Sequence, residues 1–124
     1  MQRKFIEIKE KIGQFNKEIV VDGDKSLSIR WALISSQALG VSRAKNLLKS
    51  DDVKDAIRCL KKLGIKILTS KDNCYIYGRG INGFKFKKNI VLNAGNSGTL
   101  GRLILALLIK SPYKIKITGD KSLS

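Results

Sequence analysis

The chain has 124 residues, enough for one ordinary domain, and 43% of them are hydrophobic, which permits a buried core and argues against disorder. Its 25 Lys and Arg residues outnumber 10 Asp and Glu residues, and the formal net charge of +15 attracts anionic partners. Histidine is absent, and Cys59 and Cys74 lack the spacing of metal ligands. This pattern excludes His-based triads and His-containing zinc sites, and we expect no metal.

The positive charge leaves two interpretations open. The chain is either a small basic nucleic-acid-binding module or a domain with a lysine-rich solvated surface. The lysines are spread along the chain, with only pairs such as Lys61-Lys62 and Lys87-Lys88, and aromatic residues make up 6%. That is too few for an obvious stacking platform, so we expect no nucleic-acid partner.

Targeting signals are not evident. Residues 1–15 mix charged residues with single apolar ones and lack the apolar core of a signal peptide. The longest apolar run, 103–109, is far shorter than the roughly 20 residues that span a membrane. Two unpatterned cysteines suit a reducing compartment. We expect a cytoplasmic protein without a membrane partner.

The sequence pattern at the start of the chain predicts two strands and one helix. Residues 3–9 alternate weakly as a strand does, and residues 17–21 predict a second strand. A helix is expected over 29–39, with Ser26 or Ser28 as its N-cap.

The middle of the chain contains the clearest helix signal. After a possible short strand at 42–48, the run Ser50-Asp51-Asp52 caps an amphipathic helix that Gly64 terminates. Its acidic residues lie at its start and lysines near its end, as the macrodipole favours. Strands at 65–69 and 74–77 follow, joined by a polar turn.

The last third predicts a strand at 89–92, a helix at 97–110 and a closing strand at 113–118. Because the helix is apolar on nearly all sides, we expect it to be buried. The order of strands and helices indicates an α/β or α+β fold.

One hexapeptide, Gly-Asp-Lys-Ser-Leu-Ser, occurs at 23–28 and again at 119–124. Each copy follows a short apolar strand pattern, which suggests an architecture of copied units. Since the second copy is followed by nothing, we expect the chain to be incomplete.

The first copy has the composition of an anion-binding turn. Gly23 permits a tight turn, and the following helix offers free backbone N–H groups and the positive end of its dipole. Lys25 and Ser26 lie at that end, and Arg30 follows within the helix. The alternative is that a serine only caps the helix and Lys25 is solvated.

A second turn of this kind runs from Asn93 into the last helix. Asn96 and Thr99 offer polar groups, Gly98 allows a ligand to approach the backbone, and Arg102 opens the helix. The alternative is an ordinary N-cap with a solvated arginine, and the Walker and Rossmann spacings are absent. Two such turns together suggest a ligand with more than one anionic group.

These motifs carry a resemblance over nearly the whole chain. The segments 23–30, 50–53, 96–99 with Arg102, and 119–120 resemble, in this order, the 5-enolpyruvylshikimate-3-phosphate synthase family of enolpyruvyl transferases. The related UDP-N-acetylglucosamine enolpyruvyl transferase shares the fold, but its first turn carries a Lys-Asn pair where this chain has Lys25-Ser26. It is the alternative within the superfamily.

The resemblance implies roles for residues of both turns. Lys25 is expected to contact both substrates and to act in catalysis, and Ser26 and Arg30 are expected to hold shikimate 3-phosphate. Asn96 and Gly98 are expected to line the phosphoenolpyruvate side. The supporting residues of this motif are Thr99 and Arg102.

The family reaction transfers the enolpyruvyl group of phosphoenolpyruvate to shikimate 3-phosphate and needs no cofactor. The resemblance implies an inside-out α/β barrel built from βαβαββ units, in an enzyme that is a monomer. Residues 1–20 would belong with the second domain, and 21–124 would be an incomplete first domain: one unit and the start of the next. The chain alone would hold half of the site, lack activity and be marginally stable. A glycine at position 98 also implies sensitivity to glyphosate.

Overall fold

The computed structural model describes residues 6–11, 13–14 and 16–123. Within them helices and strands are interspersed, as expected for a mixed α/β chain. Their bounds, in chain order, are α1 Lys25–Gln37, β1 Leu39–Lys45, α2 Asp51–Lys62, β2 Lys66–Thr69, β3 Asn73–Arg79, β4 Val91–Asn93, α3 Gly98–Leu108 and β5 Lys116–Thr118.

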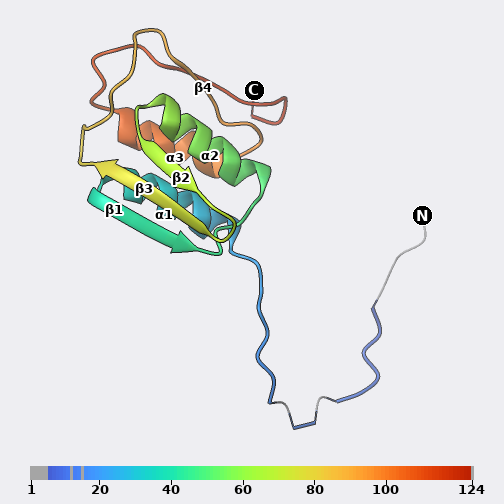
Figure 1. The fold of residues 1–124 in the computed structure, drawn as a ribbon. Coiled ribbons are helices and arrows are strands. Elements are labelled where there is room, and N and C mark those ends of the chain that lie inside the picture. The colour runs from blue at the N-terminus through green and yellow to red at the C-terminus, as the bar shows by residue number, and fades with distance from the viewer. Residues whose placement is uncertain (1–5, 12, 15, 124) are drawn as a thin grey trace.

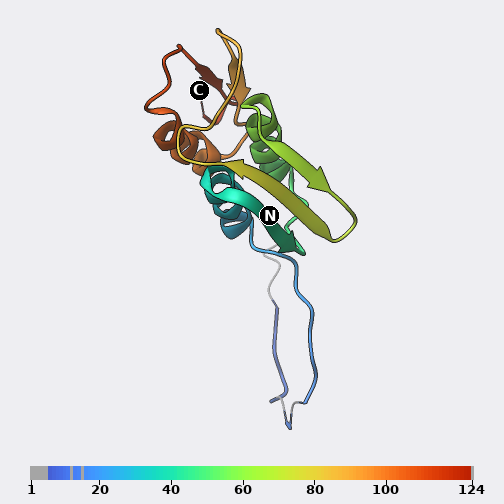
Figure 2. The same cartoon turned by 60° about the vertical axis from the view of Figure 1, so that its left-hand side comes forward.

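A three-stranded antiparallel sheet has the order β1-β3-β2, and the helices cover one of its faces (Figures 1 and 2). The alternation of β3 decides which face is which. Cys74 and Ile76 are buried against the helices, whereas Tyr75 and Tyr77 point to the other face and are half-buried. One face of this sheet is therefore open.

A second, two-stranded sheet joins β4 and β5 in parallel. Helix α3 connects them, which makes β4-α3-β5 a βαβ crossover. The carboxyl ends of both strands lie at the same edge of the sheet, because the strands are parallel. The turns that follow the two strands, 94–97 and 119–123, consequently lie side by side.

The core lies between the helices and the two sheets. It is built from aliphatic side chains of all three helices and from β2, β3 and β4, together with two cysteines. Fully buried examples are Ile29 of α1, Leu60 of α2, Ile76 of β3 and Ile104 of α3. Burying each such side chain contributes about 1.5–3 kcal/mol, so these contacts are what holds the layers together.

The structure confirms the helix that was predicted after Ser50. The Ser50 hydroxyl accepts a hydrogen bond from the Val53 amide, Asp51 and Asp52 occupy the first turn, and Gly64 takes a positive φ of +86° just beyond the end. A Cβ on Gly64 would clash with the Lys85 carbonyl, so this glycine is required by space as well as by φ.

The start of α1 differs from the prediction. The helix begins at Lys25, because the Asp24 carboxylate accepts from the Leu27 amide at 2.7 Å and so acts as the N-cap. Neither Ser26 nor Ser28 caps the helix. The Ser28 hydroxyl accepts instead from the Leu48 amide at 3.2 Å, a tertiary contact that local sequence does not reveal.

Three strand predictions also need correction. The strand expected at 42–48 runs over 39–45, and Asn46 ends it with a φ of +58°. Residues 6–9 and 17–21 form no strand; the rest of the 3–9 prediction lies outside the described residues. A strand needs a neighbouring backbone to pair with, and these segments have no such neighbour in the part that the structure describes.

Helix α3 is buried on one face only, which contradicts the expectation of a fully buried helix. Leu100, Ile104 and Leu108 face the core, but Leu105 is 56% exposed and Ile109, just past the helix, is 83% exposed. The buried residues recur every four positions, so one stripe of α3 faces the core, where the helix contacts α1.

Among the described residues no helix combines the length and the apolar character that crossing a membrane requires.

Candidate anion-binding site

The first turn places two predicted site residues at the start of α1. Lys25 and Ser26 are the first two residues of the helix, directly after the Asp24 cap. The Asp24 side chain occupies the Leu27 amide, so the amides of Lys25 and Ser26 are the ones that face the end of the helix. The positive end of the helix dipole and the Lys25 ammonium lie together at this end of α1, and they are the groups there that can bind an anion.

Lys25 is held by a residue of another helix. Its Nζ lies 3.0 Å from Oδ2 of Asp52, which is in the first turn of α2. The Asp52 side chain is 18% exposed and that of Lys25 is 54% exposed, so the pair contributes at most about 1 kcal/mol to stability. Its larger effect is on position: the ammonium is fixed between the amino ends of α1 and α2.

Ser26 and Arg30 lie four residues apart in α1 and therefore share one side of the helix. Ser26 is half-buried and Arg30 is exposed. A hydroxyl and a guanidinium on one side of a helix start can bind one phosphate together, the first as a donor and the second as a charged fork.

The second turn connects β4 to α3 through two local hydrogen bonds. Asn93 Oδ1 accepts from the Gly95 amide at 2.8 Å, and the buried Ser97 hydroxyl accepts from the Leu100 amide at 3.1 Å, which caps α3. Gly98 is the first helical residue. A Cβ at Gly98 would meet only Leu123 Cδ2 at 3.9 Å, so the protein itself leaves room on this side.

Asn96 is exposed in this turn, and the second copy of the hexapeptide contacts it. The Ser122 hydroxyl lies 2.9 Å from Asn96 Oδ1, and the Asp120 amide donates to the Gly95 carbonyl at 2.9 Å. The Ser122 hydroxyl and amide also donate to the Asp120 carboxylate, which lowers the pKa of Asp120. The turn after β4 and the turn after β5 thus form one hydrogen-bonded unit at the edge of the β4–β5 sheet.

Helix α2 connects the first turn to the second. Asp55, one helical turn after Asp52, packs against Gly95, where a Cβ would clash with its carboxylate. Gly95 has a φ of +58°, so both its conformation and its space call for glycine. Asp55 also pairs with Arg58, and the Cys59 thiol lies 3.3 Å from the Asn93 carbonyl. Burial raises the pKa of Cys59, with the charge of Asp55 as a smaller cause.

The structure therefore places the predicted residues in two separate groups. Lys25, Ser26 and Arg30 form the first group, and Asn96, Gly98 and Thr99 form the second. No hydrogen bond or ion pair joins them directly in the described part of the chain; α2 supports both. Arg102 is exposed near the start of α3, where solvent stabilises its charge.

Sequence patterns did not reveal Asp52 or Ser122. The acidic pair at the start of α2 has an adequate local explanation in the helix macrodipole, which hides the ion pair with Lys25. Ser122 repeats Ser26 in the hexapeptide, yet its hydroxyl faces Asn96. The only available signal for Asp52 was its position within the motif that carries the family resemblance.

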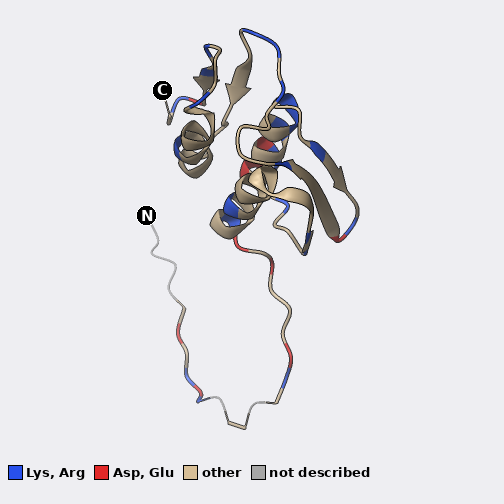
Figure 3. Cartoon of the chain, turned by 90° about the vertical axis from the view of Figure 1, so that its left-hand side faces the viewer, with Lys and Arg blue, Asp and Glu red and all other residues tan. Residues whose placement is uncertain are grey.

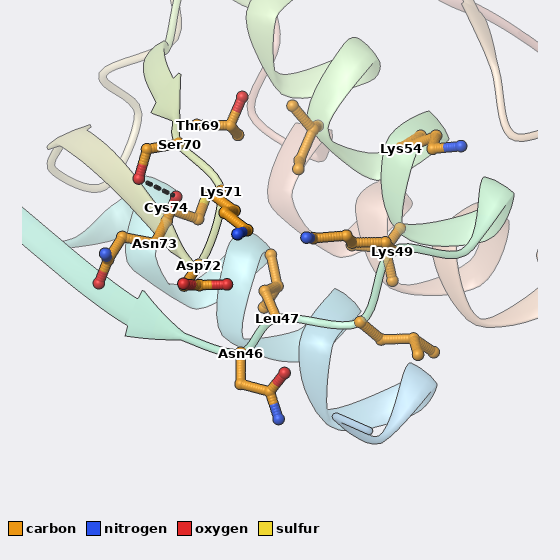
Figure 4. A pocket seen from close by; sticks show the side chains of 13 residues that line it. Asn46, Leu47, Lys49, Lys54, Thr69, Ser70, Lys71, Asp72, Asn73 and Cys74 are labelled. Carbon is orange, nitrogen blue, oxygen red and sulfur yellow. Dashed lines mark hydrogen bonds between the residues drawn. The ribbon is translucent and has the colours of Figure 1, made fainter. Parts of the chain in front are cut away.

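A separate cavity of about 270 Å³ lies between α2 and the turn that joins β2 to β3 (Figure 4). Leu47, Val53 and Ile57 contribute apolar walls, and Lys49 and Lys71 point toward it. A neighbouring hollow of about 310 Å³ is lined by 22–23 and 46–50. Neither contains a residue of the two anion-binding groups, which lie on the open surface at helix starts.

Comparisons with known proteins identify the family of the chain. The family model for EPSP synthase (3-phosphoshikimate 1-carboxyvinyltransferase) matches residues 9–124. The 3-phosphoshikimate 1-carboxyvinyltransferase of Syntrophomonas wolfei is 41% identical over 107 residues, which are 86% of this chain and 25% of that protein. The enzyme of the same name from Streptococcus pyogenes is 39% identical over 121 residues, 98% of this chain and 28% of that protein.

Solved structures give the same answer. An EPSP synthase from Acinetobacter baumannii matches with a TM-score of 0.78 at 32% identity, and the match covers 86% of this chain and 24% of that one. The chain thus spans about a quarter of the length of the relatives it matches. The predicted family and the mixed α/β fold are confirmed: the chain belongs to the EPSP synthase family.

Proposed function

We propose that the complete protein carrying this chain transfers the enolpyruvyl group of phosphoenolpyruvate to shikimate 3-phosphate, in the biosynthesis of aromatic amino acids. Family membership supports the reaction. The observation that carries the proposal on this chain is the Lys25–Asp52 pair. Lys25 Nζ lies 3.0 Å from Asp52 Oδ2, which fixes the ammonium between the amino ends of α1 and α2. Such a position suits two anionic substrates that must meet at one point.

The chemistry is a substitution at a vinyl carbon. A C–O bond forms between a hydroxyl oxygen of shikimate 3-phosphate and the carbon that bears the phosphate of phosphoenolpyruvate. The C–O bond to that phosphate breaks, and the hydroxyl proton balances the released phosphate. In this chain the acid–base group that we propose is Lys25, which contacts both substrates.

Each anion-binding group has its own substrate in this proposal. Ser26 and Arg30 hold the phosphate of shikimate 3-phosphate, with Lys25 beside it. Asn96 and Gly98 line the phosphoenolpyruvate side, where the absence of a Cβ at Gly98 leaves space. We assign Thr99 and Arg102 to support of the second turn, since both lie in the first turns of α3.

The proposal extends to domain organisation and location. Residues 1–20 belong with a second domain and 21–124 with the first, which is an inside-out barrel of βαβαββ units. The order α1-β1-α2-β2-β3 matches the last five elements of such a unit, and β4-α3-β5 would begin the next. We further propose a monomer located in the cytoplasm, where the free, buried Cys59 and Cys74 would stay reduced.

Ligand protection tests the assignment of shikimate 3-phosphate. At a concentration about 100-fold above its dissociation constant, the ligand stabilises the complete protein by about 2.7 kcal/mol, seen as a rise in Tm. The variant Arg30→Gln loses most of this shift, whereas Lys54→Gln, an exposed lysine outside the site, keeps it. An unchanged Tm of the unsubstituted protein with shikimate 3-phosphate would reject this substrate.

A further inference from the structure

The open face of the β1-β3-β2 sheet is distinct from the site described above. The helices cover the opposite face (Figure 2). The outward side chains come from alternate positions of the three strands. The register brings these side chains into cross-strand rows: Arg43 pairs with Tyr75, and Lys66 pairs with Tyr77. The full outward set is Leu39, Val41, Arg43, Lys45, Lys66, Leu68, Asn73, Tyr75, Tyr77 and Arg79.

This face is positively charged and carries no acidic side chain among those outward residues. Arg43 and Lys45 come from β1, Lys66 from β2 and Arg79 from β3, so every strand contributes a cation. Figure 3 shows Lys and Arg spread over the chain, which is why their arrangement on one sheet face was hidden in the sequence. Cations spread over three neighbouring strands, with no acidic side chain among the outward residues, favour an extended polyanion.

Two of the three tyrosines of the chain lie next to each other on this face. Lys66 Nζ lies 4.7 Å from the centre of the Tyr77 ring, and Arg43 Cζ lies 5.9 Å from that of Tyr75. Each ring therefore has a flexible cation over it. A base that stacks on the ring would take the place of that cation and bring its phosphate within reach of the displaced side chain.

The remaining exposed residues agree with this partner. Val41 is 57% exposed and Leu68 is 48% exposed, and they flank the tyrosines on β1 and β2. Apolar and aromatic side chains under the bases, with cations at their sides, form the arrangement that open sheet faces use for single strands. A double helix presents its phosphates outward and hides its bases, so it would leave the tyrosines unused.

From these observations we propose that the open face of the β1-β3-β2 sheet binds single-stranded nucleic acid, with Tyr75 and Tyr77 under the bases and Arg43, Lys45, Lys66 and Arg79 near the phosphates. This is a second activity, separate from enolpyruvyl transfer. The sequence disfavoured nucleic acid because aromatic residues were few; the present proposal rests instead on where Tyr75 and Tyr77 lie.

The test measures binding of a fluorescent oligouridine of about 12 nucleotides, within the usual range of single-strand site sizes, by anisotropy at several salt concentrations. The complete protein is compared with Arg43→Gln/Lys66→Gln and with a control of equal charge, Lys87→Gln/Lys88→Gln, two exposed lysines outside the sheet. Removing two phosphate contacts lowers the slope of log affinity against log salt by about 1.4 in the sheet variant, and the control keeps its slope.

A third variant, Tyr75→Leu/Tyr77→Leu, separates stacking from charge. It is expected to weaken binding roughly tenfold or more while leaving the salt slope unchanged, since it removes ring faces and no cation. Equal losses in the sheet and control variants would show only general attraction to a basic protein and would overturn the proposal. So would undiminished binding by the tyrosine variant, or binding to anionic phospholipid vesicles without binding to the oligonucleotide. Unchanged enolpyruvyl transfer by all three variants confirms that each is folded.

Discussion

Asp52 Oδ2 lies 3.0 Å from Lys25 Nζ, and this ion pair joins the first turns of α1 and α2. Asp51, its neighbour, points to solvent with a side chain that is 94% exposed and pairs with Lys54 of its own helix. Two adjacent carboxylates therefore have different roles. Asp52 orients the proposed catalytic lysine, whereas Asp51 contacts only a residue of its own helix.

Replacing Asp52 with Asn is expected to reduce kcat/KM of the complete enzyme by roughly 10- to 100-fold, because the ammonium of Lys25 is no longer held in position. Unfolding free energy falls by less than about 1 kcal/mol, since the pair is partly exposed. Asp51→Asn is the matched control and keeps full activity. Equal kinetics for both variants would show that the ion pair does not position Lys25.

Replacing Gly95 with Ala tests the support that α2 gives to the second turn. The φ of +58° alone costs about 1–2 kcal/mol for a residue with a Cβ, and the added methyl must displace the Asp55 carboxylate. We expect a loss of about 1–3 kcal/mol in urea unfolding of the complete protein. Gly101→Ala, where a Cβ meets only Ala94 Cβ at 3.7 Å, is expected to be neutral or stabilising. A stable Gly95→Ala variant would contradict the packing described here.

The pKa of Asp120 is expected to rise toward its ordinary value of 3.8 in Ser122→Ala, because the hydroxyl that donates to its carboxylate is removed. A lowered pKa in the folded state means that the stabilising contact is present above the unfolded pKa and is lost as pH falls through the folded one. The effect therefore lies below about pH 4. NMR titration of the carboxyl carbon measures it, with Ser111→Ala as the control; the same pKa in both variants would exclude the hydroxyl as a cause.

Replacing Gly98 with Ala is expected to raise the KM for phosphoenolpyruvate and to lower sensitivity to glyphosate in the complete enzyme. The protein accommodates the methyl group, which meets only Leu123 Cδ2 at 3.9 Å, so folding is preserved and any effect arises from the ligand. Inhibition curves with and without the substitution check this. Identical curves would place the phosphoenolpyruvate side away from Gly98.

The fold could be predicted where several neighbouring sequence features indicate the same element. The Ser50 cap, the amphipathic period and Gly64 all indicate the same helix, and α2 has those bounds. At α1, three residues can each serve as the cap, and only the contact between Ser28 and the Leu48 amide removes one of them. The N-terminal strands were wrong because pairing, unlike capping, depends on a distant backbone.

The repeated hexapeptide shows the same limit within one chain. In the first copy Asp24 caps a helix of 13 residues, whereas the second copy forms turns in which Asp120 accepts from the Ser122 amide. The repeated sequence predicted two polar turns, each after a strand, and the second copy does follow a strand, β5. They did not predict that Ser122 contacts Asn96, since that contact depends on the parallel pairing of β4 and β5.

Phosphate release by the complete protein with both substrates tests directly whether Lys25 is the catalytic residue of an enolpyruvyl transfer. Lys25→Met is expected to lower kcat by about a hundredfold or more, because it removes the acid–base group and the charge between the substrates. Lys54→Met, on the neighbouring helix, is expected to retain the kcat of the unsubstituted enzyme. A Lys25→Met enzyme as active as the Lys54→Met control would show that Lys25 is not the catalytic residue.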